Sequence, residues 1–274
     1  MDLNKVLLEV EKTILEAGTL LDTFWEKREN LRIENKEGQG LVSLADKEVE
    51  KFLIQKLKLI IPSAKFCAEE SSFDNPKNKD EFLEGYSWMI DPLDGTNNFL
   101  SGFDYFSISI ALCSDAKPIL AAVYRPRRGD LFLAIKGQGA FVQNQKSNIA
   151  KRKIDNIYRS KSLKQSLLCT GFAGEKGISF DREFDVFKNV MMKSRGVRRL
   201  GSAALDLCYL ASGSWNGFWE KGLAPWDTSA GALICQESGV QVSNIKGEPY
   251  CPFDKTIVVC PEDIKQELLS ILNQ

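Results

Sequence analysis

Two aspartates spaced three residues apart are the sharpest chemical feature of this sequence. Asp91 and Asp94 belong to the segment Asp-Pro-Leu-Asp-Gly-Thr, which directly follows the apolar run Tyr86–Ile90. Because proline and glycine favour turns, this segment predicts a tight turn at the end of a strand. Such a turn can bring both carboxylates to one point, and it leaves the Leu93 carbonyl free to act as a further oxygen ligand.

The next two residues, Gly95 and Thr96, suit a bound ligand. A glycine lets the backbone approach a ligand closely, and the threonine offers a hydroxyl beside it. If a helix begins after Thr96, its free N–H groups would also suit a phosphate. An ordinary exposed Asp-Gly turn is the plain alternative. The apolar strand before the segment argues against it, because that strand places the acids at the end of a buried element.

Further acids stand at comparable places in the chain. Glu69 and Glu70 directly follow a short apolar run, and we expect Glu70 to be solvated or to lie behind the site. Asp227 and Asp46 stand at predicted helix starts, where an acid can serve only to cap free N–H groups and stabilise the helix dipole. Both interpretations, cap and site residue, therefore remain open at Asp46 and Asp227.

A convergence of four acids would require cations. Two like charges about 4 Å apart repel by about 4 kcal/mol at an effective dielectric constant of 20. The chain contains no histidine, so it lacks the commonest general base and the commonest transition-metal ligand. Oxygen ligands favour magnesium, calcium or manganese over zinc. Two or more such ions would neutralise the acids, activate water and create a site for phosphoryl transfer without a covalent enzyme intermediate. A phosphatase with an aspartyl nucleophile is disfavoured. That chemistry requires a second aspartate two positions after the first, whereas Asp91 and Asp94 are three positions apart.

Composition narrows the class of protein. The 274 residues include 36 Lys and Arg and 37 Asp and Glu, so no net charge indicates a nucleic acid or an anionic membrane as a partner. No apolar run approaches the about 20 residues that cross a bilayer, and the acidic start is unlike a signal peptide, so we expect a cytoplasmic protein. The seven cysteines are widely spaced without a Cys-x-x-Cys pair, and we expect buried free thiols.

The elements that position these residues can be predicted from periodicity. Apolar residues three and four apart predict helices over 3–28 and from Ser43 to Pro62, separated by a polar loop over 32–40. Apolar runs predict the strands of the first half, which are 65–68, 86–90, 105–113, 119–124, 131–135 and 140–143. The polar, basic stretch 145–165 is expected to be a solvated connection, with a nucleic-acid patch as the alternative.

Strands and helices alternate in the second half. The predicted strands are 167–170, 197–200, 217–220, 240–242 and 256–260, and the predicted helices are 180–193, 203–211, 225–239 and 262–272. Antiparallel strands first and alternating elements second predict an α/β (α+β) protein of two packed halves, 1–145 and 146–274, that form one compact unit.

Four segments together resemble the inositol monophosphatase family. Tyr86–Ile110 (YSWMIDPLDGTNNFLSGFDYFSISI) is similar to the first family signature, and Leu223–Gly239 (LAPWDTSAGALICQESG) is similar to the second. Val197–Gly222 lies between them and also matches, and Ala68–Ser71 resembles the acidic pair of the family. The motifs follow the family order from the first helix to the last. Together they are highly specific.

The resemblance implies metal ligands. Glu69 would bind a metal together with Asp91 and the Leu93 carbonyl. A second metal would be held by Asp91, Asp94 and Asp227, and a third, weaker ion could lie near Glu69. The implied cofactor is Mg²⁺, two or three per site, with Mn²⁺ as a substitute.

The resemblance also implies catalytic and substrate contacts. Thr96, backed by Asp46, would orient the water that attacks phosphorus, and with Glu69 these residues form the implied catalytic set. Glu220 matches a residue that binds sugar-alcohol hydroxyls in relatives. The implied substrate contacts are Asp94, Gly95, Thr96, Gly201, Ser202, Ala203, Glu220 and Asp227.

Members of the family fold as a layered αβαβα sandwich, usually form homodimers and are often inhibited by lithium, and we expect the same here. This chain departs from the family pattern at the substrate rim. Ser101 and Gly102 stand where relatives often have a histidine, Asp104 stands where many have proline, and Asn144 is followed by Gln145 rather than glycine. These departures leave the subfamily open.

A small phosphate monoester of the inositol 1-phosphate type is the first expected substrate. The alternatives within the family are a 3′(2′),5′-bisphosphate nucleotide, fructose 1,6-bisphosphate and histidinol phosphate. Asn97 and Asn98 speak against the nucleotide, because that group usually has a Lys-Glu pair there. Arg198 and Arg199 could reach a second phosphate, but we expect them to flank a strand and pair with acids. A regulatory, partner-binding protein on the same scaffold is the alternative of another class, and the intact set of metal-site residues argues against it.

Overall fold

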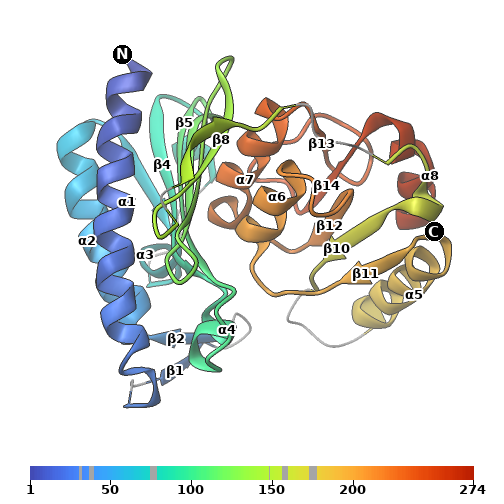
Figure 1. Ribbon diagram of the computed structural model, residues 1–274, viewed down its shortest axis with the longest axis horizontal. Helices are drawn as coiled ribbons and strands as arrows, with labels where there is room; N and C mark the ends of the chain where they lie inside the picture. The colour runs from blue at the N-terminus through green and yellow to red at the C-terminus, as the bar shows by residue number, and fades with distance from the viewer. Residues whose placement is uncertain (31–32, 37–39, 75–78, 148, 156–159, 173–177) are drawn as a thin grey trace.

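Helices and sheets alternate in five layers in the computed structural model of this chain (Figure 1). The structure describes residues 1–30, 33–36, 40–74, 79–147, 149–155, 160–172 and 178–274. In order across the molecule, the layers are α1 (Leu3–Trp25) with α2 (Leu44–Ile60), a seven-stranded sheet, α6 (Ala203–Ala211) with α7 (Pro225–Glu237), a five-stranded sheet, and α5 (Ile178–Lys193) with α8 (Glu262–Leu272). This arrangement confirms the expected layered αβαβα sandwich.

The seven-stranded sheet follows the order of the chain. Its strands run β3-β4-β5-β6-β7-β8-β9, and only β3 and β4 are parallel. Most of its central residues are buried because helices cover both faces. The strands are β3 (Lys65–Ala68), β4 (Tyr86–Asp94), β5 (Ser107–Ser114), β6 (Lys117–Arg125), β7 (Asp130–Ile135), β8 (Gly139–Asn144) and β9 (Ile149–Lys153).

The five-stranded sheet mixes both strand directions. In the order β11-β10-β12-β14-β13, β10 is parallel to β11 and β12, whereas β14 is antiparallel to both of its neighbours. Its strands are β10 (Leu167–Thr170), β11 (Gly196–Arg198), β12 (Gly217–Lys221), β13 (Gln241–Ser243) and β14 (Thr256–Cys260).

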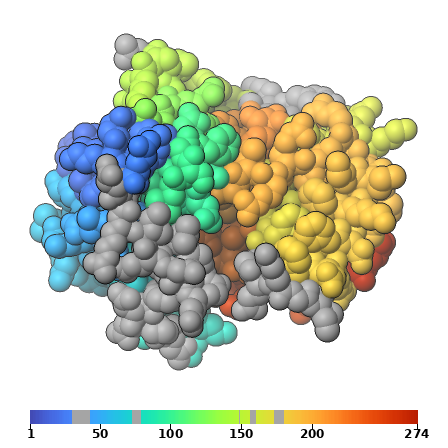
Figure 2. Space-filling model, turned by 90° about the horizontal axis from the view of Figure 1, so that it is seen from below, coloured from blue at the N-terminus to red at the C-terminus, as the bar shows by residue number. Residues whose placement is uncertain are grey.

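The helices take their places through their apolar faces. Val10, Ile14 and Leu21 of α1 and Leu53 and Leu57 of α2 are completely buried against one face of the seven-stranded sheet. A second core joins the other face of that sheet to α6 and α7, so these two helices are buried almost all round. The second core therefore holds the two halves of the chain together, and Figure 2 shows them packed side by side.

The short elements complete the fold around the middle layer. Two small helices, α3 (Glu69–Asp74) and α4 (Thr96–Leu100), follow β3 and β4 directly, and three 3₁₀ turns, η1 (Arg28–Asn30), η2 (Lys79–Phe82) and η3 (Leu163–Gln165), lie in connections. A separate hairpin is formed by β1 (Ile33–Lys36) and β2 (Gly40–Ser43).

Three local expectations were wrong. The segment that starts at Asp91 continues β4 to Asp94 and does not turn away after Ile90. The polar stretch 32–40 contributes strand residues to the β1–β2 hairpin, because backbone pairing does not require apolar side chains. The basic stretch 145–165 contains β9, which pairs with β8 as an exposed edge strand, and charged side chains are usual on such an edge.

The cysteines are free thiols, as their spacing predicts. All seven thiols are free, and six of them are buried. Among the described residues, no helix combines the length and the apolar character that crossing a membrane requires.

Candidate active site

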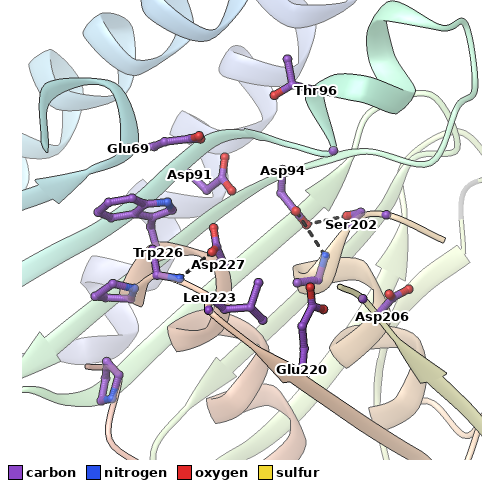
Figure 3. A pocket seen from close by; sticks show the side chains of 18 of the residues that line it. Glu69, Asp91, Asp94, Thr96, Ser202, Asp206, Glu220, Leu223, Trp226 and Asp227 are labelled. Carbon is purple, nitrogen blue, oxygen red and sulfur yellow. Dashed lines mark hydrogen bonds between the residues drawn. The ribbon is translucent and has the colours of Figure 1, made fainter. Parts of the chain in front are cut away.

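A pocket of about 800 Å³ lies where the two halves meet. Its lining comes from both halves: β4 and α4 on one side, and the start of α6, the end of β12 and the start of α7 on the other. Figure 3 shows the acidic side chains turned into it. The pocket is lined by every predicted site residue except Asp46, namely Glu69, Asp91, Leu93, Asp94, Gly95, Thr96, Gly201, Ser202, Ala203, Glu220 and Asp227.

A bulge at the end of β4 presents the two central aspartates. Asp91 pairs with Ser109 of β5, but Asp94, three residues later, pairs with Ser107, two residues away. The extra residue on β4 breaks the register, and such bulges re-aim side chains. The Asp91 carboxylate accepts a hydrogen bond from the Leu93 backbone N–H at 2.9 Å, which fixes the bulge. The two carboxylates therefore enter one pocket from a continuous strand.

Gly95 ends the bulged strand with a backbone that only glycine adopts easily. Its φ is 94°, in the left-handed region, and a side chain there would come within 3.1 Å of the Gly201 and Tyr105 carbonyl oxygens. Asn98 closes the same junction, because its amide donates to the carbonyls of Tyr105 at 2.7 Å and of Leu200 at 2.8 Å. No local pattern around Asn98 indicates this role, because both carbonyls belong to other parts of the chain.

Asp94 joins the two halves at the start of α6. It accepts hydrogen bonds from the Ser202 hydroxyl and from the backbone N–H groups of Ala203 at 3.2 Å and Ala204 at 2.9 Å (Figure 3). Burial raises its pKa to about 6, and these hydrogen bonds oppose the rise. The carboxylate is thus turned toward α6 in this structure.

Asp227 is both a helix cap and a pocket residue. Its carboxylate accepts the backbone N–H of Ala224 at 2.7 Å at the start of α7, as the capping interpretation predicts. It also faces Asp91 in the pocket, and burial raises its pKa to about 7. The pKa of Asp91 lies well above its ordinary value because of burial and of the nearby charges of Glu69, Asp94 and Asp227.

Glu69 begins α3, and a buried acid of α2 fixes the start of that helix. Glu50, 3% exposed, accepts the backbone N–H groups of Glu70 at 2.7 Å and Ser71 at 2.8 Å, and the Ser71 hydroxyl as well. Glu70 is buried and not solvated, contrary to one of the two expectations for it. Glu50 was not predicted as part of the site. Because it stands one helical turn after Asp46 on the same face of the helix, its position could have indicated that it lies near the site.

Asp46 lies behind Thr96, outside the pocket. The Thr96 hydroxyl stands 3.0 Å from a carboxylate oxygen of Asp46 and 3.0 Å from the Leu93 carbonyl, so it can donate to either. Asp46 is 1% exposed, and its other oxygen accepts the Ser43 N–H at 2.8 Å in a capping box. Burial raises the pKa of Asp46. As with Asp227, the residue caps a helix and also supports the pocket.

The side of the pocket away from Glu69 has a different character. Glu220 of β12 and Asp206 of α6 both line it, and Arg199 lies at the same side (Figure 3 for the two acids). Burial raises the pKa of Asp206 to about 7 and holds that of Glu220 well above its ordinary value, and the charge of Arg199 opposes both shifts. Asp206 was missed because it stands in an otherwise apolar helix pattern.

The four acids around Asp91 suit hard cations by their chemistry. All are carboxylates, the Leu93 carbonyl adds an oxygen, and burial together with the charges of the other three acids raises the pKa of Asp91. Within the described part of the chain, no group of three acidic or cysteine side chains is already placed so that it could hold a metal ion. Asp94 is turned toward Ser202, and its Oδ1 accepts the 3.2 Å bond from Ala203. By their chemistry, the carboxylate and carbonyl oxygens of this set suit a divalent cation.

The chain is similar to known proteins along nearly its whole length. A model of the inositol monophosphatase family matches residues 2–274. The protein named Nus factor SuhB of Pasteurella multocida (strain Pm70) is 32% identical over 270 residues, covering 98% of this chain and 96% of that protein. Inositol-1-monophosphatase of Rhizobium meliloti (strain 1021) is 31% identical over 264 residues, covering 96% and 94%.

A solved structure of similar fold is the extragenic suppressor protein suhB from Bartonella henselae, with a TM-score of 0.86 and 31% identity over 98% of this chain and 99% of that chain. The match extends along the whole length of the sequence, and the acidic motifs quoted above lie within it. The chain therefore belongs to the inositol monophosphatase family and is a phosphoric monoester hydrolase.

Proposed function

We propose that this protein hydrolyses a small phosphate monoester of the inositol 1-phosphate type with the help of Mg²⁺. The observation that carries the proposal is the gathering of four carboxylates, Glu69, Asp91, Asp94 and Asp227, in one pocket, where burial and the charges of the other three raise the pKa of Asp91. Such a cluster repels itself unless cations or protons neutralise it. The relative named Inositol-1-monophosphatase supports the choice of substrate.

Glu69, Asp91, the Leu93 carbonyl, Asp94 and Asp227 would hold the ions. When bound, Mg²⁺ supplies Lewis-acid activation of water and neutralises charge on the phosphoryl oxygens. Turning toward an ion would cost Asp94 part of its hydrogen bonding to α6. A cation bound to Asp94 would therefore be coupled to the junction between the two halves.

Thr96 and Asp46 would handle the proton of the attacking water. When the Thr96 hydroxyl donates to Asp46, its oxygen lone pairs can accept a hydrogen bond from a water in the pocket. Asp46 is held by Ser43 and cannot swing away, so it fixes the direction of the hydroxyl. A carboxylate with a raised pKa is better suited than an ordinary one to take up a proton relayed through Thr96.

The other side of the pocket would receive the alcohol part of the ester. Glu220 and Asp206 lie there, and two acids disfavour a second phosphate. Arg199 compensates only part of that charge. The neutral polyol part of inositol 1-phosphate therefore fits this side of the pocket better than the second phosphate of fructose 1,6-bisphosphate or of a bisphosphate nucleotide.

Phosphate release from a panel of esters would test the proposal. The panel contains inositol 1-phosphate, glycerol 2-phosphate, fructose 1,6-bisphosphate, 3′-phosphoadenosine 5′-phosphate and histidinol phosphate, each measured with Mg²⁺ and with excess EDTA. We expect inositol 1-phosphate to give the highest kcat/KM and EDTA to abolish turnover. Full turnover in EDTA, or a preference for a bisphosphate, would contradict the proposal.

A second candidate function is binding to a protein partner. The relative named Nus factor SuhB favours it, because that name describes a factor and not a hydrolase. The two functions are compatible on one chain. Absence of phosphate release from every ester in the presence of Mg²⁺ would favour the binding role.

A further inference from the structure

Asp206 is buried in the pocket and held by a tyrosine. Its side chain is 2% exposed, and its Oδ1 accepts the Tyr105 hydroxyl at 2.8 Å. The backbone of Asp206 is fixed as well, because its N–H donates to the Ser202 carbonyl at 2.9 Å and its carbonyl accepts the Trp215 indole N–H at 2.7 Å. The carboxylate therefore has one orientation relative to the pocket.

Tyr105 is itself immobilised by its neighbours. Arg125 lies 4.9 Å from the centre of its ring, and the Tyr209 ring stacks beside it with centroids 6.1 Å apart. Arg125 is fixed in turn by Asp104, through bonds of 2.9 Å to the carbonyl and 3.0 Å to the carboxylate, and by the Tyr209 hydroxyl at 3.0 Å. Asp104 is the residue that stands where many family members have proline, and here it anchors Arg125.

Glu220 approaches the same side of the pocket through a gap left by a glycine. A methyl group added at Gly171 would overlap the Glu220 carboxylate, so a larger residue there would displace the acid. The Glu220 carboxylate accepts no hydrogen bond from the part of the chain that the structure describes, and its acceptor capacity is open to the pocket. Asp206 likewise keeps acceptor sites beyond those that the Tyr105 hydroxyl and the Cys169 thiol occupy, since a carboxylate can accept about four hydrogen bonds.

We propose that Asp206, oriented by Tyr105, acts with Glu220 as a pair of hydroxyl acceptors that selects phosphate esters of polyols. This inference rests on the proposed function and names the residue that gives it specificity. Two fixed carboxylates on one side of a pocket match neighbouring hydroxyl donors of a polyol ring. A substrate without such hydroxyls would leave the remaining acceptor sites of both acids without donors, which weakens its binding.

The test compares two esters in four proteins: the wild type, Asp206→Asn, Tyr105→Phe and the control Tyr124→Phe. Tyr124 is a buried tyrosine on β6, next to α1 and outside the pocket lining. The esters are inositol 1-phosphate, which carries hydroxyls, and phenyl phosphate, which carries none. Steady-state kcat and KM are measured for each pair at saturating Mg²⁺.

Asp206→Asn is expected to raise KM for inositol 1-phosphate about tenfold, the effect of one hydrogen bond to a charged group, while kcat changes little. Tyr105→Phe should shift KM in the same direction by a smaller factor. Both variants should hydrolyse phenyl phosphate with kcat/KM within about twofold of the wild type. The Tyr124→Phe control should match the wild type on both esters.

A fall by the same factor on both esters would show that Asp206 only supports the fold and would overturn the inference. An unchanged KM for inositol 1-phosphate in Asp206→Asn would overturn it as well. If Asp206→Asn proves unstable, Gly171→Ala replaces it, because that change displaces Glu220 without touching α6, and the same selective rise of KM is expected. Wild-type protein that hydrolyses neither ester would instead refute the proposed function, and the inference with it.

Discussion

Two groups of acids share one pocket in this protein, and they are neutralised in different ways. The first group, here called the Asp91 cluster, consists of Glu69, Asp91, Asp94 and Asp227. The second, here called the Asp206 pair, consists of Asp206 and Glu220. Burial raises the pKa of the carboxyls for which a shift is resolved in both groups. Burial is the largest cause in both groups, and the charges of neighbouring acids add to it for Asp91 and Asp227 and also for Asp206 and Glu220. The groups differ in that the charge of Arg199 opposes the shift in the Asp206 pair.

The difference indicates what each group needs from outside. The Asp206 pair has Tyr105 as a donor and Arg199 as a partial counter-charge, so hydroxyl groups are sufficient to complete it. In the Asp91 cluster, Asp94 and Asp227 accept hydrogen bonds from the neutral backbone N–H groups of Ala203, Ala204 and Ala224, and four carboxylates share one site. Such a cluster requires cations or protons to neutralise it.

The largest effect is expected from removing one charge of the Asp91 cluster. Asp94→Asn keeps the shape of the side chain and an acceptor for the α6 hydrogen bonds but removes a charged oxygen ligand. We expect kcat in Mg²⁺ to fall by about 10³-fold or more, because the site supplies most of the stabilisation of transition-state charge. Asp115→Asn is the control, since Asp115 lies in an exposed turn and accepts only from Gly85 and Ser114. Full magnesium-dependent turnover in Asp94→Asn would exclude it as a ligand.

A smaller loss of kcat is expected when the hydroxyl of Thr96, which lies outside the Asp91 cluster, is removed. Thr96→Val removes the hydroxyl that lies 3.0 Å from Asp46 and keeps the branched shape. We expect kcat to fall about 10²-fold, the lower end of the range for general acid–base catalysis, with little change in the Mg²⁺ requirement. Thr96→Ser restores a hydroxyl and should recover most of the activity. Equal losses in the valine and serine variants would mean that packing, and not the hydroxyl, matters at Thr96.

The contribution of Glu50, which fixes the start of α3, can be tested without changing Glu69. Glu50→Gln replaces one accepting oxygen by an NH₂ group, which cannot accept the N–H groups at the start of α3. We expect the Mg²⁺ concentration for half-maximal activity to rise about tenfold, as for other residues that orient a metal ligand, with kcat at saturating Mg²⁺ largely kept. Calorimetric titration with Mn²⁺ measures the affinity without turnover. Glu48→Gln, an exposed acid on the same helix, is the control. An unchanged Mn²⁺ affinity would show that the α3 cap does not position Glu69.

Elements whose pattern is complete within one segment are predictable from the sequence, whereas elements that depend on a distant partner are not. Local patterns predicted the helix Ala203–Ala211 and the strand Thr256–Cys260 with the observed bounds, because their apolar periodicity is complete within the segment. The bulge between Asp91 and Asp94 depends on pairing with β5, a partner that the segment itself does not contain. The local sequence favours a turn after Ile90, but pairing with β5 continues the strand to Asp94.

The candidate site shows the same limit. Asp91, Asp94 and Asp227 could be named because each stands beside a turn or helix-start signal and in a motif that resembles the family. Glu50 and Asp206 stand inside helix patterns, where an acid usually indicates an exposed face. Their roles depend on contacts with residues 20 and 101 positions away in the chain. Such contacts follow only from the packed layers.

The smallest expected effect is a change of thermal stability with pH, caused by the buried acids of the Asp91 cluster. The pKa values of Asp94, about 6, and Asp227, about 7, are raised above the ordinary value of 3.8, so the folded state binds more protons than the unfolded state between about pH 4 and pH 7. The stability of the metal-free protein should therefore fall as pH rises through that window and level off above it. We expect the Tm in EDTA to be a few degrees higher near pH 5.5 than near pH 8, and Mg²⁺ to raise the Tm more at the higher pH. Asp227→Asn should flatten the pH dependence in EDTA, because the amide does not titrate. A Tm that rises with pH in EDTA would contradict the view that bound protons stabilise the Asp91 cluster when no cation is present.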